Sequence, residues 1–399
     1  MKIKNLHIKE FKGLRDISIN FEKNDKPLDL VVLAGSNGSG KTRVLDSILD
    51  YFQKIVNHIE NENVAGVFFE TDEQNCLNQG YNSNMLYLIL NNYSDENIFE
   101  RGRKVVEENL KVFPKIIYVP TETNFQKVEI ASPMLVREYK FLNIVDTGLI
   151  KDVPSYIATK IIEMANDQED TPMQEIRTAV FKEINEIFEI LDLDIKISGI
   201  SKNAKSIPIF TNSAGDKFDI NELSSGEKQL FLRTLAIKML NPENSIILID
   251  EPELSLHPKW QQRIVDVYRK IGKNNQIIIA TQSPHILGSV KKENIMLLDK
   301  DDEGKIVIKT GDELYDSYGQ PTDRILEDIM GLKTTRNQEI FDKLEKIREM
   351  VNEDKYETDD FKKEYGDLKE ILGTMDEDIM LIDMEIQIRR KGLKNVKNK

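Results

Sequence analysis

Hydrophobic and polar residues alternate in two early segments of the chain, around residues 3–8 and 17–21. A period of two is typical of strands that bury one face. Residues 30–34 form an unbroken apolar run, which predicts a central strand covered on both faces. After a glycine-rich stretch, apolar residues return at helical spacing over residues 44–56. The pattern therefore predicts antiparallel strands first, and then a buried strand, a loop and an amphipathic helix.

Three later apolar runs, at residues 116–120, 245–249 and 276–280, predict further buried strands. Residues 60–112 are polar and irregular, with several asparagines, and we expect surface strands and loops there.

Helical periodicity dominates residues 135–200 and the charged region beyond residue 320. The clearest helix in the first region is expected to begin with Thr171 as its N-cap, Pro172 in the first turn and Gln174 as the capping-box partner. The second region has the pattern of a separate helical appendage.

Composition limits the kind of protein that the chain can be. The chain has 399 residues, long enough for two or three structural units. No apolar run approaches the roughly 20 residues that a membrane-spanning helix needs, and the first residues have a strand pattern unlike a signal peptide. Cys76 is the only cysteine and the four histidines are scattered, so we expect no disulfide and no Cys/His metal site. These features predict a cytoplasmic protein with no membrane contact.

The net charge of −14 argues against a surface that coats nucleic acid uniformly, but a local basic face remains compatible with it. Residues 389–399 carry six basic residues and no acidic one. We interpret this tail as a solvated, frayed terminus.

Residues 35–42 fit the phosphate-loop pattern G-x-x-x-x-G-K-[ST] between the predicted strand and helix. Backbone N–H groups of such a loop, together with the helix N-terminus, bind phosphates. Lys41 can neutralise phosphate charge, and the Thr42 hydroxyl can bind Mg²⁺. The predicted nucleotide contacts in this loop are Gly35, Asn37, Gly38, Ser39, Gly40, Lys41 and Thr42.

Residues 245–252 supply the complementary acidic group. A buried strand delivers Asp250 to the Mg²⁺ shell, where it joins Thr42. Glu251 follows directly and is the predicted catalytic residue that polarises water against the γ-phosphate. Without the phosphate loop, an Asp-Glu pair here would be an ordinary strand end meeting solvent.

Residues 223–229, Leu-Ser-Ser-Gly-Glu-Lys-Gln, open another predicted helix. The functional interpretation is that Ser224, Ser225, Gly226 and Glu227 contact nucleotide, with Ser225 and the Gly226 N–H donating to phosphate oxygens at the helix N-terminus. The alternative is an ordinary helix cap with Ser225 at the N-cap.

Together, segments 1–60, 115–125 and 207–300 resemble the soluble ABC-type ATPases of the SMC/RecF/OLD group, also described as AAA-family ATPases. Residues 253–258, Glu-Leu-Ser-Leu-His-Pro, match the form of the D-loop that is typical of this group rather than of transporter subunits. The resemblance implies an α/β fold. It would consist of an ABC-type ATPase head, with antiparallel N-terminal strands and a parallel core, an inserted helical subdomain and a C-terminal helical appendage.

The resemblance also implies how the chain is divided and assembled. The expected parts are an N-terminal lobe with the phosphate loop, a mainly helical insertion, a C-terminal lobe with the other nucleotide motifs, and the appendage, at residues 1–134, 135–206, 207–315 and 316–399. In the family, the signature of one subunit closes over the ATP and Mg²⁺ held by another, so residues 223–229 imply a homodimer or a higher homo-oligomer.

The segment at residues 281–285, Thr-Gln-Ser-Pro-His, departs from the family pattern. Relatives commonly have a histidine that senses the γ-phosphate where this chain has Gln282. Glutamine can donate a hydrogen bond to a phosphate oxygen but cannot carry charge, so we predict slow hydrolysis. His285 either compensates or is simply a histidine at a helix start. No glutamine stands at the usual Q-loop position, and the candidates for that role are Gln126 and Glu122.

The sequence around residues 320–326 and the helices that follow resemble ATPases encoded in antiphage systems, those of Septu and of some retrons. That likeness implies an ATPase that scaffolds or restrains a partner nuclease, often of the HNH type, with direct contact to DNA or RNA left open. The alternative is a RecF/SMC-like DNA-repair ATPase that clamps DNA itself. A self-contained OLD-type nuclease is disfavoured because only helical sequence follows the ATPase, and a transporter subunit by the D-loop.

Overall fold

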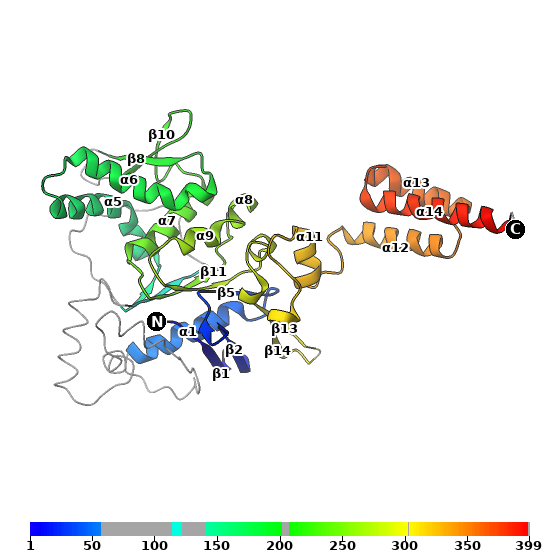
Figure 1. Ribbon diagram of the computed structural model, residues 1–399, viewed down its shortest axis with the longest axis horizontal. Coiled ribbons are helices and arrows are strands. Elements are labelled where there is room, and N and C mark those ends of the chain that lie inside the picture. Colours follow the sequence, from blue (N-terminus) through cyan, green and yellow to red (C-terminus); the bar gives the residue numbers. More distant parts are fainter. Residues whose placement is uncertain (57–113, 122–140, 202–206, 302, 398–399) are drawn as a thin grey trace. The chain divides into compact units, whose positions relative to one another are not determined.

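The computed structural model describes residues 1–56, 114–121, 141–201, 207–301 and 303–397 (Figure 1). The chain divides into two compact units, residues 1–325 and 326–399. The division falls a little beyond the boundary at residue 316 that we expected from the sequence.

A seven-stranded sheet organises the first unit, in the order β14–β13–β5–β12–β11–β6–β7. All neighbouring pairs are parallel except β13 and β14. The middle strands are buried along their whole length, which explains their unbroken apolar sequences. The seven strands are β5 (Leu30–Ala34), β6 (Ile116–Val119), β7 (Leu142–Ile144), β11 (Ile246–Asp250), β12 (Gln276–Ala280), β13 (Ile295–Lys300) and β14 (Ile306–Thr310).

The antiparallel hairpin β1–β2 (Asn5–Phe11 and Leu14–Asn20) and helix α1 (Lys41–Val56) share one hydrophobic core with the sheet. The small pair β3–β4 (Glu22–Lys23 and Lys26–Pro27) follows the hairpin. The buried Gln276 amide ties the N-terminus to the sheet, because it accepts from Ile3 N at 2.7 Å and donates to Ile3 O at 2.8 Å. The predicted strands and amphipathic helix of this region are confirmed.

Helices α5 (Thr147–Asp167), α6 (Met173–Phe188) and α7 (Ser225–Met239) lie on the other side of the sheet from α1 (Figure 1). A separate antiparallel sheet runs in the order β10–β9–β8 (Lys217–Asp219, Pro208–Thr211 and Lys196–Ile200). Phe231 of α7 packs on Phe188 and Phe210, which joins these elements. The region is therefore mainly helical, with strands at its C-terminal end.

The predicted cap of α6 is wrong. Pro172 occupies the N-cap with an extended ψ of 134°, and no side chain caps the helix. Since the helix begins at Met173, Thr171 stands one residue too early to cap it, and Gln174 is not its capping-box partner.

Short helical segments connect the remaining strands of the first unit. They are η1 (Glu189–Leu191), α8 (Pro258–Gln261), α9 (Ile264–Arg269), α10 (Pro284–Leu287), η2 (Lys292–Asn294), η3 (Gly311–Glu313) and α11 (Thr322–Arg324), followed by the π-helical turn η4 (Ile325–Ile329).

The second unit is a bundle of three helices, α12 (Gln338–Asn352), α13 (Asp359–Leu372) and α14 (Glu377–Lys397). They enclose a core of their own, which includes Leu344, Phe361 and Ile382. The C-terminal part of the chain is therefore helical, as the sequence predicts.

The mostly parallel central sheet, the N-terminal antiparallel hairpin and the C-terminal helices confirm the predicted α/β fold class. Among the described helices, none has the length and hydrophobicity needed to cross a membrane.

Candidate nucleotide-binding site

The phosphate loop between β5 and α1 depends on three glycines. Gly35, Gly38 and Gly40 have φ values of 145°, 78° and 101°, a region that disfavours other residues. A Cβ on Gly35 would lie 2.3 Å from Leu298 O, and one on Gly40 would lie 2.9 Å from Leu14 Cδ2. The loop can keep this backbone only with glycine at these positions.

Lys41, the first residue of α1, is buried and turned back over the loop. Its Nζ donates to Gly35 O at 2.9 Å and to Ser36 O at 3.0 Å. Burial lowers the Lys41 pKa, and the nearby carboxylates of Glu251, Glu253 and Asp250 oppose that shift. The ammonium group is thus held beside the backbone amides that would contact phosphate.

Asp250, the last residue of β11, meets two hydroxyl groups. Its carboxylate accepts from Thr42 Oγ1 at 3.1 Å and from Thr121 Oγ1 at 2.7 Å. Burial raises the Asp250 pKa, while these two hydrogen bonds oppose the shift. The structure therefore brings together Thr42 and Asp250, the two predicted Mg²⁺ ligands.

Thr121 is a site residue that the sequence analysis missed. It follows β6, the parallel neighbour of β11, so both strand ends reach the same edge of the sheet. The order of the strands, which the sequence pattern does not give, is what places Thr121 at the site.

Glu251 has a left-handed φ of 43°, and its N–H donates to Ala280 O at 2.9 Å. At this residue the backbone therefore turns away from the path of β11, and the Glu251 side chain is half-buried. Buried Arg233 of α7 donates to Glu251 O at 3.3 Å and to Pro120 O at 2.7 Å. Arg233 therefore holds the backbone after β11 and the backbone after β6 in place. The sequence analysis did not identify this residue either.

Glu253 links the D-loop to the segment that contains Gln282. Its Oε1 accepts from Thr281 Oγ1 at 2.8 Å and from the Gln282 N–H at 2.9 Å. Burial raises the Glu253 pKa, and the hydrogen bonds oppose the shift. This role of Glu253 was not predicted, although its place beside Asp250 and Glu251 was a signal.

Several features of the site fit ATP and Mg²⁺. Glu253 Oε2 and Ser39 Oγ are buried oxygens without a hydrogen-bond partner among the described residues. The glycine loop has the backbone that phosphate binding needs, and a hydroxyl and a carboxylate lie together for a hard cation. Across the described ranges, no group of three or more His, Cys, Asp or Glu residues could hold a metal ion.

Residues 223–229 form a capping box at the start of α7. Ser224 Oγ accepts from Glu227 N at 3.3 Å, and the Glu227 carboxylate accepts from Ser224 N at 3.0 Å. The N-cap is therefore Ser224, and the alternative that placed Ser225 there is wrong. Ser225 is exposed in the first helical turn, where its hydroxyl and the helix N-terminus are accessible to an anion.

Gly226 is required for a close contact with the D-loop. A Cβ at this position would lie 2.5 Å from Ser255 O. The contact therefore joins the start of α7 to the D-loop.

His257, the N-cap of α8, and Gln261, the last residue of α8, make further hydrogen bonds beside the D-loop. His257 Nδ1 accepts from Lys259 N at 3.2 Å, so this histidine is the N-cap of α8. Gln261 donates to Leu256 O at 2.9 Å and accepts from Ser283 Oγ at 2.6 Å. The D-loop and the segment after β12 are thereby tied through one glutamine.

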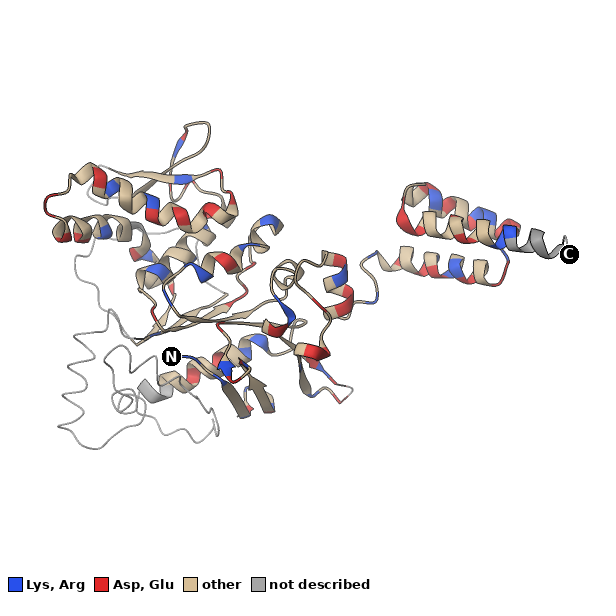
Figure 2. Cartoon of the chain, in the orientation of Figure 1, with Lys and Arg blue, Asp and Glu red and all other residues tan. Residues whose placement is uncertain are grey.

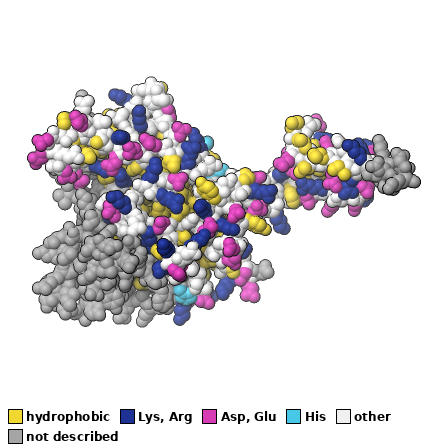
Figure 3. All heavy atoms as spheres, in the orientation of Figure 1, with side chains coloured by type: hydrophobic (Ala, Val, Ile, Leu, Met, Phe, Trp, Pro, Cys, Tyr) yellow, Lys and Arg dark blue, Asp and Glu magenta, His cyan; other side chains and the backbone are white. Residues whose placement is uncertain are grey.

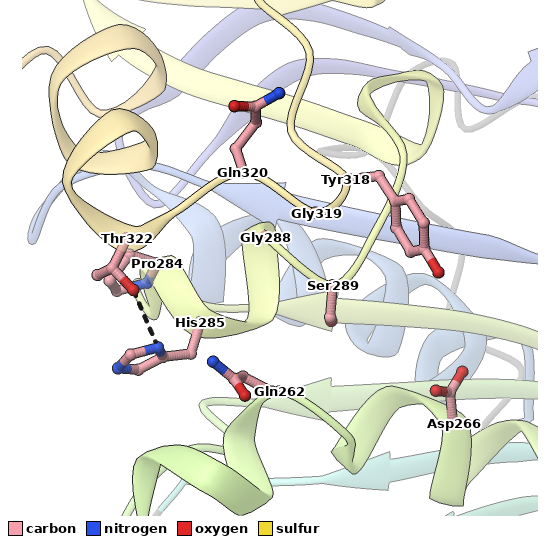
Figure 4. A pocket seen from close by; sticks show the side chains of 10 residues that line it. All are labelled: Gln262, Asp266, Pro284, His285, Gly288, Ser289, Tyr318, Gly319, Gln320 and Thr322. Atoms are coloured by element: carbon pink, nitrogen blue, oxygen red, sulfur yellow. Dashed lines mark hydrogen bonds between the residues drawn. The ribbon is translucent and has the colours of Figure 1, made fainter.

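His285 lies in α10, two residues after Ser283, the N-cap of that helix. Its Nδ1 lies 3.3 Å from Thr322 Oγ1, and both line a polar pocket of about 370 Å³ (Figure 4). No residue of the phosphate loop lines this pocket. The geometry favours the interpretation of His285 as a helix-start histidine over that of a substitute for Gln282. The two Q-loop candidates, Gln126 and Glu122, lie outside the described residues.

Two family models match the chain, each over somewhat less than half of it. "AAA domain, putative AbiEii toxin, Type IV TA system" matches residues 120–288, and "AAA ATPase domain" matches residues 1–171. The chain is also 26% identical to Septu protein PtuA of Bacillus thuringiensis over 386 residues, which cover 88% of this chain and 91% of PtuA. The predicted resemblance is confirmed.

Other similarities are more limited in extent. The Retron Ec83 probable ATPase of Escherichia coli is 28% identical over 193 residues, 48% of this chain and 34% of that protein. Among solved structures, the SMC head bound to the C-winged helix domain of ScpA aligns with a TM-score of 0.44 and 14% identity. The alignment covers 78% of this chain and 99% of that one.

Proposed function

We propose that this chain is an ATP-hydrolysing protein that dimerises through shared nucleotide sites and controls a partner nuclease in antiphage defence. The observation that carries the catalytic part is the assembly of Lys41, Thr42, Asp250 and Glu251 at one edge of the sheet. The similarity to PtuA along most of both chains supports the defence part.

Different residues of the site would bind the phosphates and the Mg²⁺ ion. The loop amides and Lys41 bind and orient the β- and γ-phosphates, while the α1 N-terminus favours their negative charge. Thr42 and Asp250 would hold Mg²⁺, which when bound supplies charge neutralisation on the phosphates. Thr121 and Arg233 keep Asp250 and the strand ends in position through the contacts described above.

Glu251 is the proposed general base. Its carboxylate orients a water molecule for attack on the γ-phosphate and accepts the proton. Gln282 lies on a backbone that Glu253 fixes, and its amide can donate a hydrogen bond to a γ-phosphate oxygen. Because an amide brings no positive charge, we expect slow turnover.

The signature requires a second subunit. Ser225 is exposed in the first turn of α7 and Gly226 is buried beside it, and the proposed ligand of the Ser225 hydroxyl and the Gly226 N–H is the ATP held by the phosphate loop of another copy. When the dimer closes, a movement of the signature would shift the D-loop through the Gly226–Ser255 contact. The hydrogen bonds of Gln261 to Leu256 and Ser283 would then move the segment that contains Gln282. This chain of contacts would couple assembly to the nucleotide state.

The proposed partner is a nuclease, with the HNH type as the specific candidate. The alternative is direct clamping of DNA by a RecF/SMC-like ATPase, which needs a basic surface. Figure 2 shows Lys and Arg interspersed with Asp and Glu along the helices of both units, which gives this alternative little support.

The test is a phage plating assay with the chain and the product of its neighbouring reading frame. We expect protection with the parent pair and loss of protection with Lys41→Ala or with a catalytically dead partner. Protection by the chain alone, combined with salt-dependent DNA binding by the purified protein, would favour the repair-type clamp and contradict the proposal.

A further inference from the structure

Helix α14 is apolar on two sides. Ile379, Ile382 and Ile386 are buried in the core of the second unit. The other side exposes Met380, Leu381, Met384 and Ile388, with exposed fractions of 45%, 54%, 56% and 67%. Hydrophobic side chains gather on the visible face of this unit in Figure 3. A helix that exposes an apolar strip opposite its buried face is expected to be covered on that side as well.

The exposed residues fall on one narrow strip of the helix. Met380 and Leu381 lie four and three residues before Met384, and Ile388 lies four residues after it. At about 100° per residue, all of them stand within about 60° of Met384 around the helix axis. We call residues 380, 381, 384 and 388 the α14 strip.

Opposite charges close the two ends of the strip. Glu377 stands seven residues before Met384 and Lys391 seven residues after it, so both fall on the same line of the helix. Both are exposed, and neither makes an ion pair or side-chain hydrogen bond among the residues that the structure describes. The strip therefore has a negative charge at one end and a positive charge at the other, at equal distances from Met384.

We propose that α14 pairs in antiparallel orientation with α14 of a second copy of this chain, with Met384 at the two-fold axis. Met380 would then face Ile388 of the second copy, and Glu377 would face Lys391 of the second copy at both ends. A two-fold interface requires a surface that is complementary to itself, and this strip meets that requirement. A parallel pair would instead bring Glu377 against Glu377.

This interface goes beyond the proposed function, because it needs no nucleotide and uses a different unit of the chain. Ile371 and Met375, which precede α14 in the sequence, are also exposed. Methionine side chains adapt readily to a facing surface, which suits Met380 and Met384. Two copies joined in this way would remain associated when the nucleotide sites are empty.

The first test reverses charges in the full-length Lys41→Ala chain without nucleotide, so that ATP-gated association cannot contribute. Sedimentation should reveal a dimer, with its dissociation constant raised about tenfold by Glu377→Lys or by Lys391→Glu alone. The double variant should restore the parent value, because both pairs form again with opposite sign. A monomeric parent, or single variants that dimerise as well as the parent, would overturn the proposal.

The second test places a cysteine on the axis in a Cys76→Ser background. Mild oxidation should join two full-length Met384→Cys chains, because residues on a two-fold axis face each other at disulfide distance. Asp367→Cys on α13, an exposed matched control, should remain uncrosslinked. Failure of Met384→Cys to crosslink would mean that something else covers the strip, such as another protein or the first unit of the chain.

Discussion

Lys41, Asp250 and Glu253 are charged side chains that burial disfavours in their ionised forms. Burial lowers the Lys41 pKa and raises those of Asp250 and Glu253. Nearby carboxylates oppose the shift of Lys41, and hydrogen bonds oppose the shifts of Asp250 and Glu253. A bound polyphosphate with its cation would add further partners, so we expect ligand binding to stabilise the first unit considerably.

Substitution of Glu251 separates binding from catalysis. Glu251→Gln should keep ATP binding but lower turnover by about 100-fold or more, since the carboxylate that accepts the proton is lost. Lys41→Ala should lose binding itself. A saturating ligand stabilises a protein by about 2.7 kcal/mol at 100 times its Kd, so thermal unfolding with ATP–Mg²⁺ distinguishes the two variants. Equal turnover by Glu251→Gln and the parent would contradict the assignment.

Gln282 should limit the rate. Gln282→His introduces a side chain that can carry positive charge toward the γ-phosphate, and we expect turnover to rise severalfold with unchanged ATP affinity. Steady-state phosphate release measures this directly. A rate that stays the same or falls would count against Gln282 as the cause of slow hydrolysis.

Lys115 gives the fold a pH dependence at alkaline pH. It is fully buried before β6, and burial lowers its pKa to about 8 from 10.5, against the opposing charge of Glu243. Between these values the unfolded chain binds more protons, so this contribution to stability is present above pH 10.5 and is lost as pH falls through 8.

The corresponding variant is Lys115→Met, which cannot titrate. From pH 8 to pH 10.5, the unfolding free energy of the parent should rise by about 3 kcal/mol relative to that of Lys115→Met. This follows from about 1.4 kcal/mol per pKa unit. Denaturant unfolding at several pH values measures the difference. A constant difference across this range would contradict the prediction.

At the residue scale, the motifs predicted which groups meet but not what holds them. Thr42 and Asp250 are joined as expected, because the spacing of a phosphate loop and an acidic strand end carries that information. Thr121, Arg233 and Glu253 were missed because their roles depend on which strands and loops are neighbours. A sequence pattern alone does not give that order.

The elements themselves were largely predictable, because buried parallel strands have continuous apolar sequences and α1 has a clear apolar stripe. Their ends were less so. Thr171 and Ser225 were each assigned one position away from the residue that occupies the cap. Ser224 and Ser225 have the same preference for a cap and Pro172 has no capping side chain, so only the backbone geometry identifies the first helical residue.

At the level of elements, packing of α7 on the D-loop makes a specific prediction for Gly226→Ala. The added Cβ would lie 2.5 Å from Ser255 O, so we expect a loss of about 1–3 kcal/mol in stability and weaker ATPase activity. Gly366→Ala is the matched control, because a Cβ there meets nothing within 4 Å and alanine favours a helix. Thermal unfolding of both variants is the measurement, and equal stability would contradict the contact.

For the whole molecule, the two units carry two different proposed interfaces. The signature of the first unit depends on ATP, whereas the α14 strip of the second unit does not. Two independent two-fold contacts in one chain allow assemblies larger than a dimer. The division into units followed from the change to charged helices near residue 320, whereas the proposed partner nuclease rests on similarity to other proteins and not on the pattern of residues.

The mass of the Glu251→Gln chain with and without ATP–Mg²⁺ tests the central claim, a nucleotide site shared between two copies. The Met384→Lys background removes the α14 contribution, and sedimentation gives the mass. We expect ATP to double the mass, and Ser225→Arg to prevent this while ATP still binds. A mass that saturating ATP leaves unchanged, with no larger assembly present beforehand, would contradict the shared site.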